Sequence, residues 1–220
     1  MPELVFIHIP KTAGLSFLHS LNEVYGEENV KQIWDLIPYH DSILHETDSV
    51  FYRDYAHARN VILDSLQSAP DYKVLFGHMP AFVIDGLYPD AKWVTWLRQP
   101  VDQVLSRVFH FRKMRINKAH WLSPWSLAKM PLFQNCQFFY TGGSLERFSF
   151  VGVLERYEEC FRMLCNLMEW GEVKPQHLHV TGFEEDKRAN LALTPEFFMD
   201  VKRNNLWDFM LYNQVANGIS

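Results

Sequence analysis

Short apolar runs recur along the chain, and longer stretches with helical spacing separate them. The runs at residues 4–9 (LVFIHI), 73–78 (KVLFGH), 92–98 (KWVTWLR) and 148–154 (FSFVGVL) are rich in β-branched and aromatic residues. Such runs are typical of strands that are buried on both faces of a sheet. A shorter run at 177–180 (HLHV) predicts one more strand.

The segments between these runs carry apolar residues every three or four positions, which predicts helices. One helix is expected over about 14–26, and another from Pro100, whose missing N–H does no harm in a first helical turn. A third is expected over about 156–170. Residues 39–68 are polar and expected to be helical in part, and a capped helix over 194–205 is followed by a further helical turn.

The alternation of strands and helices predicts an α/β fold with three layers, in which helices cover both faces of a central parallel sheet. The 220 residues have the length of one domain with a substantial core, so we expect a single domain over residues 1–220. Ligands of such sheets bind beyond the carboxyl ends of the strands. The residues that end the runs at 4–9, 73–78 and 92–98 are therefore expected to lie on one rim.

Composition narrows the range of functions. The formal net charge of −5 excludes a general nucleic-acid binder, so any anionic ligand has to be bound by a local basic site. The three cysteines cannot all pair and match no zinc pattern, which favours free buried thiols in a reducing compartment. No run approaches the roughly 18 apolar residues of a membrane span. We therefore expect a cytoplasmic protein, with removal of an N-terminal anchor from a longer precursor left open.

The segment at residues 8–17 (HIPKTAGLSF) joins the first predicted strand to the first predicted helix. The first N–H groups of a helix lack partners within it and carry the positive end of the helix dipole, so they bind anions. Lys11 adds a full positive charge, and Gly14 allows the backbone to approach a ligand closely. Thr12 and Ser16 add hydroxyl donors. The segment predicts a phosphate-binding loop; an ordinary strand–helix turn with a solvated lysine is the alternative.

The order of residues in this loop differs from that of nucleotide triphosphatases. Their motif is G-x-x-x-x-G-K-[ST], in which the lysine follows the last glycine. Here Lys11 precedes Gly14, the only glycine of the segment, so the cation stands at the start of the loop. The order argues against a nucleotide kinase or triphosphatase, which stays as the alternative enzyme class within the same broad fold.

Two further segments follow the loop in a fixed order: Arg98 to Val101 (RQPV) with Ser106, and residues 150–157 (FVGVLERY). Together with the loop they resemble the sulfotransferases that use 3′-phosphoadenosine 5′-phosphosulfate (PAPS). The loop is similar to the family's 5′-phosphosulfate loop, most closely in the carbohydrate-modifying branch that includes heparan 2-O-sulfotransferases and many bacterial enzymes. The second segment is similar to the R-D-P-x-x-R-x-x-S element for the 3′-phosphate, and the third to the V-G-x-x-E-R-F element.

The resemblance implies a P-loop-NTPase-like sulfotransferase fold and an enzyme that needs no metal. Such an enzyme transfers a sulfuryl group from PAPS to a hydroxyl or amine acceptor and releases PAP; a carbohydrate or small metabolite is the expected acceptor. The donor-binding residues that the resemblance implies are Arg98, Ser106 and the loop residues Lys11, Thr12, Ala13, Gly14, Leu15, Ser16 and Phe17. A PAP- or PAPS-binding protein without catalysis is the alternative from another functional class.

Two positions depart from the family pattern. Gln99 stands where the family has an aspartate, and Gln103 stands where it usually has a second arginine. Arg107 is a candidate for supplying the lost positive charge. Neither departure removes a residue that is expected to hold phosphate.

His78 follows Gly77 at the end of the second predicted strand, on the rim expected for Lys11. Histidine titrates near neutral pH, which suits a base that takes a proton from an acceptor hydroxyl. The Gly-His pair also resembles that of the heparan 2-O-sulfotransferase branch, where the histidine is the proposed base. We expect His78 to be catalytic and Lys11 to steady charge on the departing phosphate oxygen, with a structural strand-end histidine as the alternative. His8 is interpreted as a core residue of the first strand.

Residues 107–125 are basic and aromatic. This segment predicts contact with an anionic or sugar acceptor, a cap over the nucleotide, or a solvated helix face with core tryptophans, and the sequence leaves all three open. Asn135 and Gln137 match polar residues of the corresponding family stretch only weakly. No metal site is expected, because no ligand spacing relates the possible ligands His40, His45, Glu46 and His57.

Overall fold

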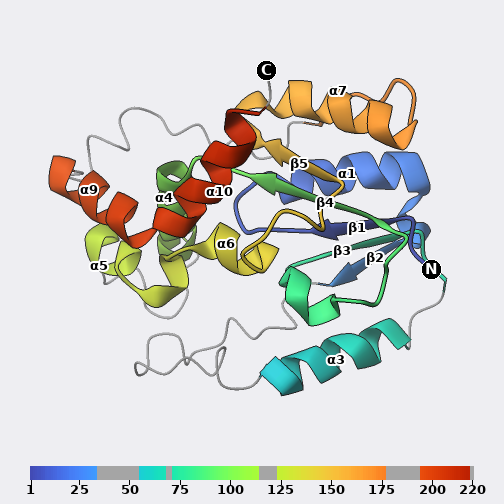
Figure 1. The fold of residues 1–220 in the computed structure, drawn as a ribbon, viewed down its shortest axis with the longest axis horizontal. Helices are drawn as coiled ribbons and strands as arrows, with labels where there is room; N and C mark the ends of the chain where they lie inside the picture. The colour runs from blue at the N-terminus through green and yellow to red at the C-terminus, as the bar shows by residue number, and fades with distance from the viewer. Residues whose placement is uncertain (34–54, 68–70, 114–122, 177–193, 219–220) are drawn as a thin grey trace.

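The computed structural model describes residues 1–33, 55–67, 71–113, 123–176 and 194–218. Its centre is a parallel sheet in the strand order β2–β3–β1–β4–β5 (Figure 1). The strands are β1 (Leu4–Ile7), β2 (Val30–Ile33), β3 (Val74–Gly77), β4 (Lys92–Leu97) and β5 (Phe150–Val153).

Helices lie on both faces of this sheet and beyond its carboxyl edge (Figure 1). The α-helices are α1 (Gly14–Tyr25), α3 (Tyr55–Gln67), α4 (Pro100–Lys113), α5 (Pro124–Ala128), α6 (Cys136–Thr141), α7 (Tyr157–Met168), α9 (Pro195–Asn204) and α10 (Leu206–Ala216). Short 3₁₀ turns complete the described elements: η1 (Glu27–Asn29), η3 (Ala81–Ile84), η5 (Pro131–Phe133) and η6 (Leu154–Arg156).

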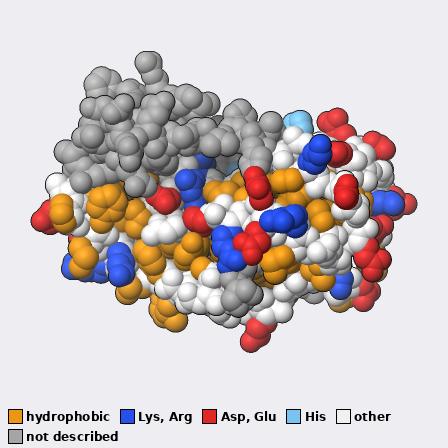
Figure 2. All heavy atoms as spheres, turned by 90° about the horizontal axis from the view of Figure 1, so that it is seen from above, with side chains coloured by type: hydrophobic (Ala, Val, Ile, Leu, Met, Phe, Trp, Pro, Cys, Tyr) orange, Lys and Arg blue, Asp and Glu red, His pale blue; other side chains and the backbone are white. Residues whose placement is uncertain are grey.

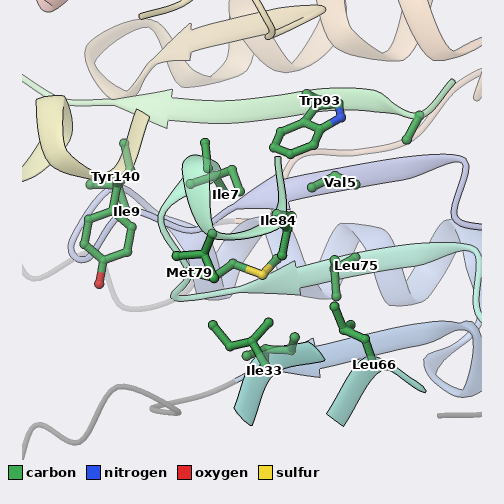
Figure 3. Packing of buried hydrophobic residues seen from close by; sticks show 14 of the residues in the cluster. Val5, Ile7, Ile9, Ile33, Leu66, Leu75, Met79, Ile84, Trp93 and Tyr140 are labelled. Carbon is green, nitrogen blue, oxygen red and sulfur yellow. The ribbon is translucent and has the colours of Figure 1, made fainter. Parts of the chain in front are cut away.

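Alternate residues of β1 supply the two cores of the molecule. Leu4 and Phe6 belong to the cluster that packs under α1 and α7, whereas Val5 and Ile7 belong to the opposite cluster. Figure 3 shows Val5 and Ile7 among the side chains of that opposite cluster, with Leu66 of α3 below them. All four residues of β1 are fully buried, because a parallel sheet covered on both faces has no solvent side.

The predicted three-layer α/β fold is confirmed, and so are the strands from the four long apolar runs. The first strand ends at Ile7, so His8 and Ile9 already belong to the following loop. Sequence reasoning missed β2, whose residues VKQI include two polar positions. This strand pairs only with β3 in the sheet, and its edge position allows Lys31 and Gln32 to stay partly exposed. The run at 177–180 lies outside the described residues.

The predicted helices at 14–26, 156–170 and 194–205 appear with bounds close to those expected. A 13-residue helix, α3, occupies the later part of the polar stretch at 39–68, and the earlier part lies outside the described residues. Leu15 of α1 departs from the apolar spacing of this helix, since it is 44% exposed. Phe17 is fully buried, and its ring packs in a tilted arrangement against that of the sheet residue Phe6, at 4.6 Å between centroids.

All three cysteines are buried and free, as the sequence predicted. Burial raises the pKa of each thiol above its ordinary value, which keeps the thiols protonated and unreactive. Among the described helices, none is long and apolar enough to cross a membrane.

Candidate functional site

The loop between β1 and α1 has an unusual backbone. Lys11 and Ala13 adopt left-handed conformations, with φ of 69° and 66°, which non-glycine residues rarely do. Ala13 is the N-cap of α1 and has no side-chain acceptor, so the N-cap residue itself makes no side-chain hydrogen bond to the helix start. Strain of this kind concentrates at binding sites, where it aims backbone N–H groups at a ligand.

The start of α1 is suited to an anion. The first helical hydrogen bond runs from the N–H of Phe17 to the carbonyl of Ala13 at 3.1 Å, so the N–H groups of residues 13–16 precede the helical ladder. No acidic residue stands in the first turn. Glu23, Glu27 and Glu28 lie exposed at the opposite end of α1, and acidic side chains gather at the right-hand end of the molecule in Figure 2. Both the helix dipole and the distribution of acidic residues therefore make the loop the more positive end of α1.

Three loop side chains predicted to bind the donor are turned into the protein. The hydroxyl of Thr12 is buried and donates to the carbonyl of Ile9 at 2.8 Å, so it closes the turn. Phe17 is fully buried, and its N–H already serves the helix. Ser16 is 4% exposed. The Thr12 hydroxyl and the Phe17 side chain thus have contacts within the chain, and the donor contacts expected of the loop residues stay predictions.

Gly14 is required by a neighbouring histidine. A Cβ atom at this position would lie 1.9 Å from Nε2 of His8, so only a glycine lets the imidazole pack on the start of the helix. His8 is 5% exposed, and its ring centroid lies 4.2 Å from that of His78. The two histidines lie side by side because each directly follows one member of the pair Ile7 and Gly77, which are opposite each other on neighbouring strands.

His8 is buried, as the sequence predicted, and it also packs against His78 at the rim. Burial holds its pKa well below the ordinary value, and the nearby charges of His78 and Lys11 add to this effect. The imidazole of His8 is neutral at pH 7 in consequence. His78 itself is partly exposed, and its backbone N–H donates to the carbonyl of Ile33 at 3.0 Å.

Arg98 connects the end of β4 to the loop. Its Nη1 donates to the carbonyl of Lys11 at 3.2 Å, which brings the guanidinium beside the left-handed turn. The backbone around Arg98 is held from two sides. The side chain of Gln137 forms hydrogen bonds with both the backbone N–H and the backbone carbonyl of Arg98. The backbone N–H of the next residue, Gln99, donates to the Glu155 side chain at 2.8 Å. The loop, the arginine segment and the later family-like segment thus meet at one point.

The two departures from the family pattern have structural functions here. Gln99 precedes α4 and accepts a hydrogen bond from the N–H of Asp102 at 3.0 Å, so it caps the helix as a shorter aspartate does elsewhere. Gln103 is fully buried and donates to the carbonyl of Pro10 at 3.0 Å, which ties α4 to the loop. Sequence reasoning missed the contact of Gln103, because this contact depends on how α4 packs against the distant loop.

Arg107, the candidate for supplying the lost positive charge, is buried among aromatic and acidic neighbours. It is 2% exposed, and its guanidinium lies 5.0 Å from the ring centroid of Phe133. Its charge acts on the buried carboxyl of Asp208. Ser106, one position earlier on α4, is 5% exposed. The glycine of the third segment also has a steric reason: a Cβ on Gly152 would lie 1.9 Å from the ring of Trp96.

The loop rim, formed by residues 8–16 with His78 and Arg98, thus lies beyond the carboxyl ends of the neighbouring strands β3, β1 and β4. This is the arrangement expected from the sequence. An open groove of about 420 Å³ lies in the adjoining helical layer. This aromatic groove is lined by Phe82, Pro131, Gln134, Asn135, Phe138, Phe139, Gly142 and Gly143. Sequence reasoning did not single it out, because its aromatic residues come from η3 and α6, which only folding brings together.

Within the described ranges, no three side chains of the types His, Cys, Asp and Glu gather as metal ligands would. His40, His45 and Glu46 lie outside the described residues, as does the middle of the basic, aromatic segment at 107–125.

The arrangement of the chain is similar to that of solved sulfotransferases. The crystal structure of a sulfotransferase from Alicyclobacillus acidocaldarius aligns with a TM-score of 0.52 and 14% identity, over 98% of this chain and 95% of that chain. The chain has a sulfotransferase fold. A mouse sulfotransferase, SULT7A1, complexed with PAP, aligns with a TM-score of 0.49 and 9% identity, over 92% of this chain and 62% of that chain. No protein-family model and no curated protein matches the chain significantly.

Proposed function

We propose that the chain is a PAPS-dependent sulfotransferase, which transfers a sulfuryl group to a hydroxyl or amine of a carbohydrate or small metabolite and releases PAP. The observation that supports this most directly is the contact between Arg98 and the loop. A guanidinium stands 3.2 Å from the carbonyl of Lys11, beside a helix start that favours anions. A donor with phosphates at both its 5′ and 3′ positions needs two such cationic points close together.

In this proposal the loop and Arg98 bind different phosphate groups of the donor. The N–H groups of residues 13–16 and the ammonium of Lys11 bind the 5′-phosphosulfate. Arg98 and Ser106 bind the 3′-phosphate, for which a planar guanidinium supplies two parallel hydrogen bonds. No metal has a part in this scheme, because the loop and the two side-chain cations neutralise the phosphate charge.

His78 acts as the base. It takes the proton from the acceptor hydroxyl as the oxygen forms a bond to sulfur, and the bond between sulfur and the bridging phosphate oxygen breaks. Lys11 stabilises the negative charge that develops on that oxygen. The chain thereby contributes alignment, a base and charge stabilisation, which are the contributions expected for an in-line group transfer. The free buried thiols support a reducing location, and we place the reaction in the cytoplasm.

A ligand panel tests the donor. Thermal unfolding of the protein is measured with PAP, with PAPS, with ATP and magnesium, and with GTP and magnesium. The proposal requires stabilisation by PAP and PAPS and little response to the triphosphates, because binding to the folded state raises the unfolding temperature. A response to ATP with magnesium, without one to PAP, would identify a kinase-like protein and end the proposal.

His78→Asn tests catalysis separately from binding. Turnover of PAPS with an acceptor found by mass spectrometry is expected to fall by a factor of roughly 10²–10⁴, the usual contribution of a general base, while the Kd for PAP stays unchanged. His19→Asn is the matched control, since His19 is exposed on α1. A wild-type protein that binds PAP but sulfates nothing in a broad acceptor library would be the inactive binder.

A further inference from the structure

Gln137 is a buried side chain that grips the backbone of Arg98. The N–H of Arg98 donates to Oε1 of Gln137 at 2.8 Å, and Nε2 of Gln137 donates to the carbonyl of Arg98 at 2.8 Å. The glutamine side chain is fully buried. One amide thus satisfies both main-chain groups of a single residue, as a neighbouring strand would do inside a sheet.

These two hydrogen bonds lie just beyond the end of β4, where the pairing between strands stops. The last residue of β4 that pairs with β5 is Leu97, opposite Val153. Arg98 comes next, and Pro100 then begins α4. Between the end of the strand and the start of the helix, the peptide groups of Arg98 have no ladder to join, and leaving them buried without partners would be costly.

The helix that carries Gln137 is itself fixed. The N–H of Phe138 donates to the buried carboxylate of Asp208, on α10, at 2.7 Å. The side chain of Asn135 donates to the carbonyl of Asn204 at 3.0 Å. Because α6 is anchored to α9 and α10 in this way, Gln137 approaches Arg98 from a rigid support rather than from a loose turn.

We propose that Gln137 is a positioning residue for Arg98: its amide fixes the main chain at residue 98, so that the guanidinium is directed at the 3′-phosphate of the donor beside Lys11. This inference rests on the proposed function. The carbonyl of Lys11, 3.2 Å from Nη1 of Arg98, holds the guanidinium end of the side chain. Gln137 holds the main chain from which that side chain extends. Held at both ends, the arginine is ready for its ligand before the ligand arrives.

The inference is tested by comparing two ligands that differ only in the 3′-phosphate. Dissociation constants for PAP and for 5′-AMP are measured by calorimetry, at a temperature where circular dichroism shows every variant folded. In Gln137→Leu the PAP Kd is expected to rise about tenfold, equivalent to about 1.4 kcal/mol, and the 5′-AMP Kd to stay within about twofold of wild type. Gln137→Glu is the second variant: it keeps an acceptor for the N–H of Arg98, but it replaces the donor to the Arg98 carbonyl with a buried carboxyl oxygen, so it should also raise the PAP Kd and leave the 5′-AMP Kd near that of wild type.

Two further variants separate positioning from a general loss of stability. Asn29→Leu removes a side-chain amide that donates to the carbonyl of Tyr25 at 2.7 Å, at the opposite end of α1, and should leave both constants unchanged. Arg98→Ala should remove the preference for PAP, and adding Gln137→Leu to it should then cost nothing more, since Gln137 acts through Arg98.

Parallel weakening of PAP and 5′-AMP in the Gln137 variants would overturn the inference, as would additive effects with Arg98→Ala. A wild-type protein with no preference for PAP over 5′-AMP would instead overturn the proposed function, so the two failures are told apart by the wild type alone.

Discussion

The loop rim and the aromatic groove lie in adjoining parts of the molecule and are built by different forces. At the loop rim, polar side chains hold the main chain: Thr12 bonds Ile9, Gln103 bonds Pro10 and Gln137 bonds Arg98, all within 2.8–3.0 Å. Around the groove, aromatic rings pack on each other, with Phe82 5.7 Å from Phe139 and Phe138 5.3 Å from Trp207 between centroids.

The difference matches two kinds of recognition. Directional bonds to the backbone fix atoms in place, and that suits a ligand whose phosphates never change. Contacts between rings are less directional and tolerate changes of shape. We therefore expect substitutions at the loop rim to have large effects on donor binding and turnover, and substitutions at the groove to have small effects that depend on the acceptor.

The largest effect is expected for Lys11→Ala. Removing a positive charge from the position where negative charge develops should lower kcat by roughly 10²–10³, the range found when one stabilising donor is lost. Steady-state sulfuryl transfer measures the effect, and Lys92→Ala is the control, because Lys92 is exposed at the opposite end of β4. Equal losses in both variants would show that net charge, rather than position, is responsible.

Gly14→Ala tests the packing inside the rim. The added Cβ would lie 1.9 Å from Nε2 of His8, so the variant should lose about 1–3 kcal/mol of unfolding free energy, as overpacked sites do. Urea unfolding followed by tryptophan fluorescence measures this. The double variant Gly14→Ala with His8→Ala gives the new methyl group room and should be more stable than Gly14→Ala alone. If the histidine truncation brings no recovery, the collision with His8 is not the cause.

Asp208 provides a pH test of the support behind Gln137. Burial raises the pKa of its carboxyl from 3.8 to about 6, against the opposing effects of hydrogen bonds from the backbone of Phe138 and Gln137 and of the charge of Arg107. Between these values the folded protein binds more protons than the unfolded chain, so the stability contributed by protonated Asp208 is present below pH 4 and is lost as the pH rises to 6.

Asp208→Asn should remove this dependence. At about 1.4 kcal/mol for each pKa unit, the wild type should lose roughly 2 kcal/mol more than the variant between pH 4 and pH 6.5, because part of the loss falls below and above this range. Urea unfolding at several pH values measures both proteins. Parallel stability curves would show that other groups govern the acid behaviour.

The sequence predicted the rim better than it predicted what holds the rim together. The apolar runs placed Lys11, His78 and Arg98 at strand ends, and parallel topology then brought these ends to one edge. The packing of His8 against His78 was not predicted, because it depends on the pairing of Ile7 with Gly77 in the sheet. Gln103 and Gln137 carry no local pattern, since each bonds the main chain of a residue far away in sequence. The edge strand β2 was missed for a local reason: two of its four residues are polar, so it lacks the apolar run that indicated the other strands.

The smallest effect is expected at the groove, for Phe82→Ala. Phe82 is 37% exposed, lies in η3 and lines the groove, and we expect its ring to contact the acceptor. Loss of one aromatic contact is worth about 0.5–1.5 kcal/mol, which corresponds to a rise in the KM of the acceptor of up to about tenfold. The Kd for PAP should not change, and Met163→Ala, at an exposed position of α7, should change neither constant. An effect of Phe82→Ala on PAP binding would contradict the division between the two regions, because the groove would then belong to the donor site as well.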